Sequence, residues 1–341
     1  MARRWWLTLF FALGLATGAM SAHGWGYAGH EAVGAIAERL LTSHARMRVQ
    51  AIAGISLQAA GKWADCVKGV VQTETGAFRY EPAPQYRASC VEFESDGGSA
   101  RMEDYVRRNW NNCARDPGSE PCHRQYHYTD VATQHDKYDR SHAGTHDHDI
   151  VHSVRAAIAV LQGKTTPSPL VIQDSREALL LLAHFIADLH QPLHVGAIYL
   201  DGDGQPINPD LPENRTRTIM STRGGNWINA GSTNLHALWD AIPSSVVPSA
   251  ISDRMHATAM AIRRSSGSPA SWPDQWATES LKTSNYVFKN IKLRRDPDNA
   301  ERWIAEFDDA RRTMAMKAAI QSRQLARAGA RLAHVLNEIW P

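Results

Sequence analysis

Histidine and aspartate side chains are set at helical spacing inside one apolar stretch, Leu179–His194, which reads LLLLAHFIADLHQPLH. His184 and Asp188 are four residues apart, so on a helix they project from one face, one turn apart. Pro192 has no N–H and is expected to end the helix, which lets His194 fold back toward the same face. The stretch therefore predicts a cluster of imidazole and carboxylate groups.

A second His-x-x-x-Asp pair, His236 and Asp240, follows in the segment NLHALWD. Imidazole and carboxylate side chains suit zinc and other borderline divalent metals. One such pair alone is more often an ion pair or a buried histidine with ordinary partners. The repetition of the pair, in apolar surroundings where an unpaired carboxylate would be unfavourable, indicates instead a multi-metal hydrolytic centre.

The elements that carry these residues are expected to be helical. Apolar residues recur at helical intervals in GYAGHEAVGAIAERLL, which places His30 near the start of a first helix. Asp174 is expected to open the central helix. Further helices are expected at Arg46–Ala60, Ser99–Cys113, Ile150–Gly163, Pro273–Leu293 and Asn299–Ile339.

Three segments are expected to be irregular or extended: Thr73–Asp96 with a short helix inside it, RQYHYTDV around His127, and the Gly-, Pro- and Asn-rich stretch Asp201–Ala230. The last is long enough to border an active site. No linker-like break separates the candidate ligands. The fold class is therefore expected to be mainly α, a single compact helical domain with long loops over residues 25–341.

Residues 1–24 have the organisation of a secretory signal. A basic start at Arg3 and Arg4 precedes an apolar stretch and small residues, so cleavage is expected after Gly24 and the mature chain would begin at Trp25. A membrane anchor is the alternative, but the apolar run is short for a span. A periplasmic or secreted protein is expected.

The four cysteines, Cys66, Cys90, Cys113 and Cys122, fit two disulfides in an oxidising compartment. Three connectivities are open, and proximity in the sequence favours Cys66 with Cys90 and Cys113 with Cys122. A cysteine zinc site is the alternative, but the spacings do not form paired C-x-x-C motifs.

The histidine-rich stretch from His135 to His152 offers another candidate metal site. Asp147 and Asp149, however, stand where caps of the following helix would, and the neighbouring histidines would then be solvated. The capping interpretation is favoured. A surface zinc site within residues 142–152 stays open, and the stretch is kept out of the predicted centre.

The sequence resembles the S1/P1 nuclease family, and a bacterial member of it, in a series of segments. They are Trp25 with His30 five residues on, WADCVK, QYHYTD, AHFIADLHQPLH, GGNWIN and NLHALWD, in that order. Family members are secreted zinc-dependent enzymes that cut nucleic acids and commonly prefer single strands. The resemblance implies the helical fold that P1 nuclease shares with zinc-dependent phospholipase C.

The resemblance also implies a centre of three zinc ions. One would be held by Asp65, His127, His184 and Asp188. A second would be held by His194, His236 and Asp240. The third would be bound by the α-amino nitrogen and carbonyl oxygen of Trp25, by His30 and by Asp188 as a bridge. Trp25 offers a free amine only after signal cleavage, so processing would complete the site.

Three residues beside the metals gain roles from the same resemblance. Lys68 would reach the phosphate in the transition state, and Asp130 would orient the attacking water. Tyr128 would stand beside a nucleobase and favour unstacked bases. Zinc-activated water would then attack phosphorus and leave a 5′-phosphorylated product. Ala241 departs from the polar residue of some members, so base preference is not carried over, and His190, extra to the motif, is expected behind the ligands or at the surface.

The formal net charge is only +2, so nucleic acid would have to bind through the metal centre and a local cleft. Single-stranded DNA and RNA and nucleotides are the expected substrates, with 3′-nucleotidase activity in addition. A monomer without a stable protein partner or membrane anchor is expected. Two alternatives remain: a zinc-dependent phospholipase C, which would need an apolar mouth, and a non-catalytic periplasmic zinc-binding protein, which would not need Lys68.

Overall fold

The computed structural model describes residues 25–114 and 119–341. The expected signal, residues 1–24, lies outside the described residues. Helices dominate, as the sequence predicts. They are α1 (Gly26–Leu40), α2 (Ser43–Ala53), α3 (Leu57–Ala60), α4 (Trp63–Cys66), α5 (Pro84–Cys90), α6 (Gly98–Arg108), α7 (Cys122–Gln125), α8 (Ile150–Leu161), α9 (Ser175–Leu189), α10 (Leu235–Asp240), α11 (Asp253–Met260), α12 (Trp272–Lys289) and α13 (Ala310–Ile339).

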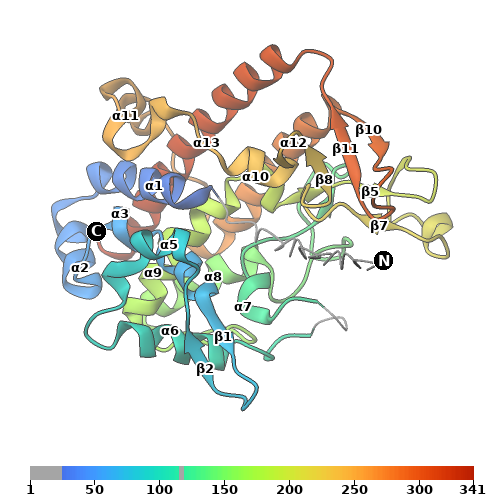
Figure 1. Cartoon of the computed structure of the whole chain (residues 1–341). Helices are drawn as coiled ribbons and strands as arrows, with labels where there is room; N and C mark the ends of the chain where they lie inside the picture. Colours follow the sequence, from blue (N-terminus) through green and yellow to red (C-terminus); the bar gives the residue numbers. More distant parts are fainter. Residues whose placement is uncertain (1–24, 115–118) are drawn as a thin grey trace, which may run out of the picture.

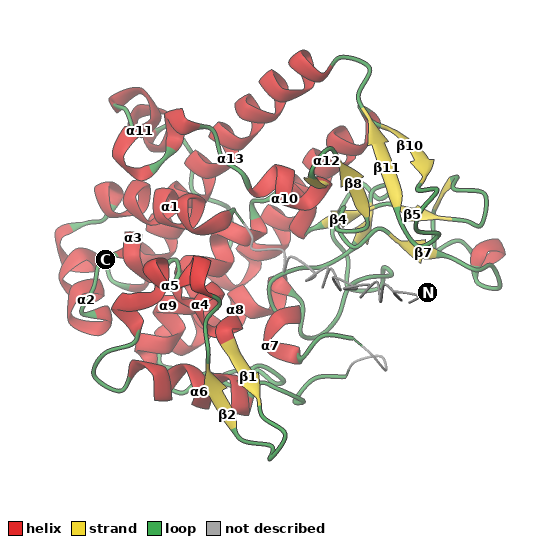
Figure 2. Cartoon of the chain, viewed as in Figure 1, coloured by secondary structure: helices red, strands yellow, loops and turns green. Residues whose placement is uncertain are grey.

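The strands are short. They are β1 (Val70–Gln72), β2 (Phe78–Tyr80), β3 (Val131–Ala132), β4 (Gly196–Ala197), β5 (Tyr199–Leu200), β6 (Pro206–Ile207), β7 (Met220–Ser221), β8 (Ile228–Ala230), β9 (Thr233–Asn234), β10 (Lys292–Arg295) and β11 (Trp303–Glu306). Figure 2 shows most of them gathered on one side of the helical body, while the β1–β2 hairpin projects elsewhere.

The helical core is built around α9, whose residues from Glu177 to Leu189 are all buried. Helices α1, α2, α8 and α13 pack against it, and α1 also lies along α13 (Figure 1). Gly329 of α13 permits this last contact, because a Cβ there would stand 2.5 Å from the side chain of Ile36. A helix buried all round is expected to be apolar all round, so the polar residues of α9 stand out.

A four-stranded sheet in the order β10-β11-β8-β9 forms the side of the molecule next to α10. Strands β11 and β8 run parallel, with Trp303 opposite Ile228 and Ile304 opposite Asn229, while the other pairs are antiparallel. The sheet thereby attaches the β10–β11 hairpin to the segment that leads into α10. It belongs to a second, smaller apolar cluster that includes Leu193, Leu235 and Trp239.

Both disulfides have the favoured pairing. Cys66 is bonded to Cys90, and Cys113 is bonded to Cys122. The first joins α4 to α5 and the second joins the segment after α6 to α7, so both fix short helices to the body of the fold.

Three expected helices are wrong in part. Arg46–Ala60 is divided between α2 and α3, because Gly54 takes a left-handed conformation (φ +68°) that ends α2. Pro273–Leu293 gives way to strand β10 at its end, and Asn299–Ile339 begins with strand β11 before α13. The backbone of Trp303 and Ile304 pairs with β8, which a local helical pattern does not reveal. The expected loop Asp201–Ala230 likewise contains the short strands β6, β7 and β8.

The histidine-rich segment before α8 is a capped turn, as favoured. The Asp149 side chain accepts hydrogen bonds from the backbone N–H groups of Val151 and His152. Asp147 instead contacts Nδ1 of His148 at 3.0 Å. His148 is buried, so the expectation that these histidines are solvated is wrong at that position.

Within the two described ranges, the search for a helix long and apolar enough to cross a membrane finds none.

Candidate metal centre

All eight histidine and aspartate side chains expected as metal ligands lie in one buried cluster, which the elements reach from several directions. His184 and Asp188 lie on α9, His30 on α1, Asp65 on α4, and His236 and Asp240 on α10. His127 follows α7, and His194 ends the 3₁₀ turn Pro192–His194. Each is less than 9% exposed. Pro192 turns the chain back as expected, because His194 returns to the face that carries Asp188.

Three subsets of these residues have ligand atoms within 4.8 Å of one another. They are His30 with Asp65 and His184, His127 with His184 and Asp188, and His194 with His236 and Asp240. Histidine and carboxylate at this spacing fit borderline divalent cations. The three groups therefore could hold metal ions.

Asp188 stands at the middle of the cluster. Its Oδ1 is 3.3 Å from Nε2 of His30, and its Oδ2 is 2.8 Å from Nδ1 of His127 and 2.9 Å from Nε2 of His184. The His30 and His184 rings stack with centroids 3.7 Å apart. One carboxylate thus faces imidazoles from three separate parts of the chain, as a bridging ligand would.

Backbone carbonyls orient three of the histidine rings. The Nδ1–H of His184 donates to Gly61 O at 2.7 Å, and that of His194 donates to His127 O at 2.7 Å. The Nδ1–H of His236 donates to Gly224 O at 2.9 Å. A proton fixed on Nδ1 leaves Nε2 with a lone pair directed into the cluster, which is the usual arrangement of metal-binding histidine.

The two outermost rings meet nitrogen to nitrogen. Nε2 of His194 is 3.0 Å from Nε2 of His236. Burial lowers the pKa of both rings, that of His236 to about 3, so both are neutral. Because the proton of each ring is on Nδ1, neither Nε2 carries a hydrogen, and the two Nε2 lone pairs face each other. A cation bound between them would remove their repulsion, whereas neither nitrogen can donate a hydrogen bond to the other.

Other buried atoms in the cluster lack a hydrogen-bond partner among the described residues. They are both ring nitrogens of His30, Oδ1 of Asp188 and Oδ2 of Asp240. Buried polar atoms without partners are unfavourable and uncommon. The atoms left over are carboxylate oxygens and imidazole nitrogens that point into one centre, so the residues present fit divalent metal.

Asp240 is held by a residue that the sequence patterns did not single out. The Gln191 amide donates to Oδ1 of Asp240 at 2.7 Å and accepts from the backbone of Leu193 at 2.6 Å. Burial raises the pKa of Asp240 well above its usual range, and a nearby cation would favour the ionised carboxylate. Gln191 thereby links the turn at Pro192 to α10.

Position 224 requires glycine, because it lies against the turn Pro192–His194. Its φ is +55°, and a Cβ there would lie 2.1 Å from the carbonyl oxygen of Leu193. Because the carbonyl of Gly224 orients His236, a side chain at this position would displace a candidate ligand. This gives a physical reason for the glycines of the GGN segment.

Lys68 and Trp25 lie at the edge of the cluster. The Lys68 ammonium is 2.6 Å from Oδ1 of Asp65, and its side chain is 8% exposed. Trp25 is fully buried just before α1, and its indole N–H donates to Ala187 O at 2.7 Å, next to Asp188. Both residues are therefore placed beside the candidate ligands.

Polar residues on α13 hydrogen-bond to the backbone next to the cluster, and local sequence patterns did not predict these contacts. Lys317 donates to Ala241 O at 2.7 Å, and the Gln321 amide donates to Trp239 O and Ala241 O at 2.7 and 2.9 Å. These bonds satisfy carbonyls at the C-terminal end of α10. The long final helix thereby holds the backbone that presents His236 and Asp240.

Polar residues of α13 also reach the end of α9 through His190. Gln324 donates to the His190 carbonyl at 2.9 Å, and Arg331 donates to its ring Nε2 at 2.8 Å. The ring Nδ1–H donates to Ile186 O at 2.7 Å. His190 is fully buried and lies behind the ligands, so the surface alternative for it is wrong.

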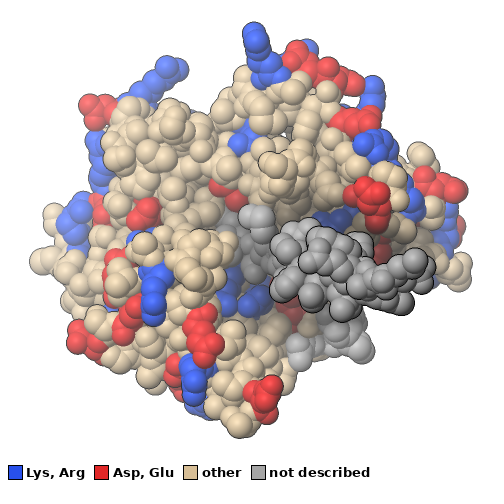
Figure 3. Space-filling view, viewed as in Figure 1, with Lys and Arg blue, Asp and Glu red and all other residues tan. Residues whose placement is uncertain are grey.

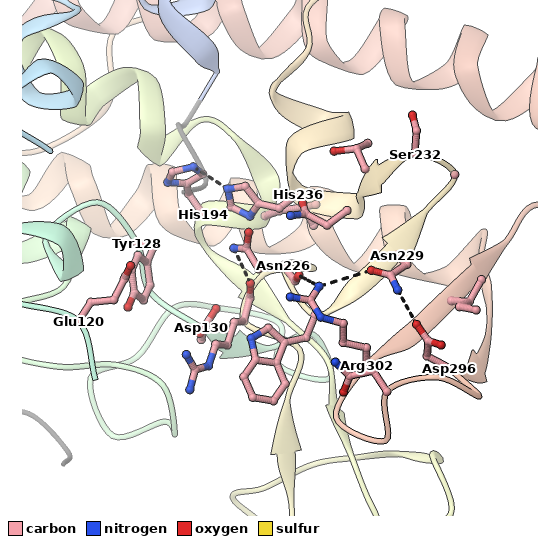
Figure 4. Close-up of a pocket in the computed structure, with 18 of the residues that line it drawn as sticks. Glu120, Tyr128, Asp130, His194, Asn226, Asn229, Ser232, His236, Asp296 and Arg302 are labelled. Atoms are coloured by element: carbon pink, nitrogen blue, oxygen red, sulfur yellow. Dashed lines mark hydrogen bonds between the residues drawn. The ribbon is translucent and has the colours of Figure 1, made fainter. Parts of the chain in front are cut away.

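The cluster opens into a cleft of about 1100 Å³. His127, His194 and His236 line its inner end, together with Lys68. Tyr128 and Asp130 line the same cleft, and Figure 4 shows both near His194. The backbone of Gly224 donates to the Asp130 carboxylate, and desolvation raises the pKa of Asp130 to about 7.

Charges of both signs are scattered over the face shown in Figure 3. This mixture agrees with the formal net charge of +2. Binding of an anionic polymer would therefore depend on the cleft and on cations held in it, as expected from the sequence.

Comparisons with known proteins agree with this arrangement. Residues 99–341, more than half of the chain, match the family described as S1/P1 nuclease. The chain is also 27% identical over 192 residues to Endonuclease 2 of Arabidopsis thaliana, in an alignment that covers 53% of this chain and 58% of that protein. The alignment thus spans less than two thirds of the relative. The matched region includes α9, the turn at Pro192 and α10, and the chain belongs to the S1/P1 nuclease family.

Proposed function

We propose that the protein is a zinc-dependent endonuclease that hydrolyses single-stranded DNA and RNA to 5′-phosphorylated products, with 3′-nucleotidase activity at the same centre. The observation that carries the proposal is the pair of neutral rings, His194 and His236, whose Nε2 lone pairs face each other at 3.0 Å beside the Asp240 carboxylate. A cation between them explains that contact, and a structural histidine pair does not.

Three zinc ions are proposed, with the ligand sets implied by family resemblance. Asp65, His127, His184 and Asp188 would hold the first. His194, His236 and Asp240 would hold the second. Trp25, His30 and Asp188 would hold the third. When bound, zinc lowers the pKa of water and neutralises charge on the phosphodiester.

The chain's own residues orient the substrate around that centre. Lys68, next to Asp65, is proposed to donate to a phosphate oxygen as negative charge develops on it. Asp130 is proposed to orient the attacking water, and the half-buried ring of Tyr128 to stack on an unpaired base. The buried position of Lys68 supports its role, because a charge in a site of low dielectric interacts more strongly with a phosphate than one in open solvent.

We further propose that residues 25–341 act as one domain, as a monomer with no stable protein partner or membrane anchor, secreted or periplasmic after cleavage following Gly24. The two disulfides support export, since such bonds persist in oxidising compartments. Mass spectrometry of the exported protein tests the cleavage site. A mature N-terminus other than Trp25 would remove its amine from the ligand set.

The experiment that tests the function compares single-stranded DNA, single-stranded RNA and phosphatidylcholine as substrates of the processed protein, with and without chelator. Chelator-sensitive cleavage of nucleic acid to 5′-phosphate ends is expected. Turnover of lipid but not nucleic acid would establish a phospholipase instead. Zinc binding without any turnover would establish a zinc-binding protein.

A further inference from the structure

The cleft extends well beyond the residues that the proposed mechanism uses. Its outer part, here called the outer cleft, is lined by residues of the turn before β8, of β8 and of the β10–β11 hairpin, namely Arg223, Trp227, Asn229, Asp296 and Arg302. Figure 4 shows Asn229, Asp296 and Arg302 on the side of the cleft away from Tyr128. Pockets for one small ligand usually measure about 300–1000 Å³, so a cleft of about 1100 Å³ has room beyond the metal centre for more of a chain-like substrate.

Arg302 is held in place without being neutralised. Its Nη1 donates to Asn226 O and Asn229 Oδ1, both at 3.4 Å, and Asn229 in turn donates to Asp296 at 2.7 Å. Across the described residues, no carboxylate oxygen lies within 4.0 Å of Arg302. A positioned guanidinium that faces a cleft and lacks an anionic partner is suited to bind phosphate.

Arg223, in the turn before β8, is a second arginine that lines the outer cleft. Its guanidinium stands 4.6 Å from the centre of the Trp227 ring, and the side chain is exposed. Within the described part of the chain it too has no carboxylate within 4.0 Å. Its backbone has a φ of +48°, unusual for a residue with a side chain, and such strain is concentrated at functional sites. The outer plane of this guanidinium is open for a nucleobase to stack on.

Arg294 provides an internal comparison. It lines the same cleft on β10, but its Nε donates to Glu306 at 2.8 Å. Of the two arginines that the hairpin contributes to the lining of the cleft, Arg294 is paired with a carboxylate and Arg302 is not.

We propose that the outer cleft is a second nucleotide subsite, in which Arg302 and Arg223 hold a phosphate that flanks the cut and a base stacks on the Arg223 guanidinium above Trp227. The inference rests on the proposed nuclease function and specifies its substrate as a strand longer than two nucleotides. A dinucleoside monophosphate has only the scissile phosphate, so it would gain nothing from these arginines.

The test measures binding of a thymidylate octamer with phosphorothioate linkages to the metal-loaded protein, by fluorescence anisotropy between 50 and 300 mM salt. The variants are Arg302→Gln and Arg223→Gln, with Arg302→Lys as a charge-retaining variant and Arg294→Gln as the matched control. Each phosphate contact contributes about 0.7 to the slope of log K against log salt for a single strand. We expect each glutamine variant at 302 or 223 to reduce the slope by about that amount, and Arg302→Lys and Arg294→Gln to leave it near the wild-type value.

Cleavage kinetics give an independent readout. The KM for an unmodified octamer should rise several-fold in Arg302→Gln and in Arg223→Gln. In Arg302→Gln, kcat/KM for a dinucleoside monophosphate should stay at the wild-type value. Equal salt slopes and equal octamer KM in these variants and in Arg294→Gln would overturn the subsite. Arg223 is exposed, so its variant retains the test if Arg302→Gln unfolds. A wild-type protein that cuts neither substrate would instead refute the proposed function itself.

Discussion

Removal of the metal should lower the free energy of unfolding by an amount comparable to its total value. Three carboxylates and five imidazoles are buried together, and several of their atoms have no hydrogen-bond partner among the described residues. A ligand that binds only the folded state stabilises it by about 2.7 kcal/mol at 100 times its Kd and about 4.1 kcal/mol at 1000 times. Three ions would contribute about 8–12 kcal/mol, against a usual free energy of unfolding of about 5–15 kcal/mol.

The expected change in melting temperature follows from the size of the domain. The entropy of unfolding is about 2.1 cal/mol/K per residue, so in a domain of roughly 300 residues 1 kcal/mol shifts Tm by about 1.5 °C. Complete chelation should therefore lower Tm by about 12–18 °C.

Differential scanning calorimetry of the processed protein, before and after dialysis against EDTA, measures this shift, and atomic emission confirms that metal has left. Protein dialysed without chelator is the control, and added zinc should restore the transition. Asp188→Asn should lose much of the chelator-sensitive shift, because Asp188 is proposed as a ligand of two of the ions. A shift below about 3 °C after full removal would refute the reasoning, since the cluster would then be stable without metal.

Three further predictions concern single residues. Lys68→Met should lower kcat by about 100- to 1000-fold with zinc content unchanged by atomic emission, and an unaltered kcat would exclude Lys68 from the mechanism. Desolvation raises the pKa of Asp130 to about 7, so its carboxylate becomes protonated as the pH drops through 7, and kcat/KM should fall over that range. The Asp130→Asn variant should be slower and should lack this inflection in its pH profile. An inflection that persists in the variant would assign the titration to another group. Gln321→Leu removes the side-chain donors to the carbonyls of Trp239 and Ala241, so the free energy of unfolding measured in urea should fall by about 1–3 kcal/mol. Chelator competition should show that one zinc ion is bound more weakly. Unchanged zinc affinity would limit this residue to a structural role.

Five of the eight candidate ligand side chains could be found from the sequence because their spacing is local. His184 with Asp188 and His236 with Asp240 each lie one helical turn apart, and Pro192 sets the direction of His194. His30, Asp65 and His127 have no such local signal, and only family resemblance indicated them. Their convergence on Asp188 depends on how α1, α4 and α7 pack on α9, which no window of sequence encodes.

The missed parts of the fold and site share one physical cause, which is pairing across long separations. Strand β11 pairs with β10 in a hairpin, and its residues Trp303 and Ile304 also pair with β8, more than 70 residues earlier. Lys317 and Gln321 look like ordinary polar positions of a long helix until α10 is placed against them. Gln191 lies within the HQPLH segment, but its role as a donor to Asp240, 2.7 Å away, depends on how α10 packs against the turn at Pro192.

Helix α13 makes the order of synthesis matter for metal uptake. The segment that contains His30 is made first, whereas the helix that secures the end of α10 through Lys317 and Gln321 is made after every candidate ligand. A nascent chain can therefore present individual histidines to passing ions, but it cannot offer the finished cavity until its last helix has docked. If the centre binds three zinc ions as proposed, their complete loading is expected to be a late event, and a partly made or truncated chain is expected to bind zinc more weakly.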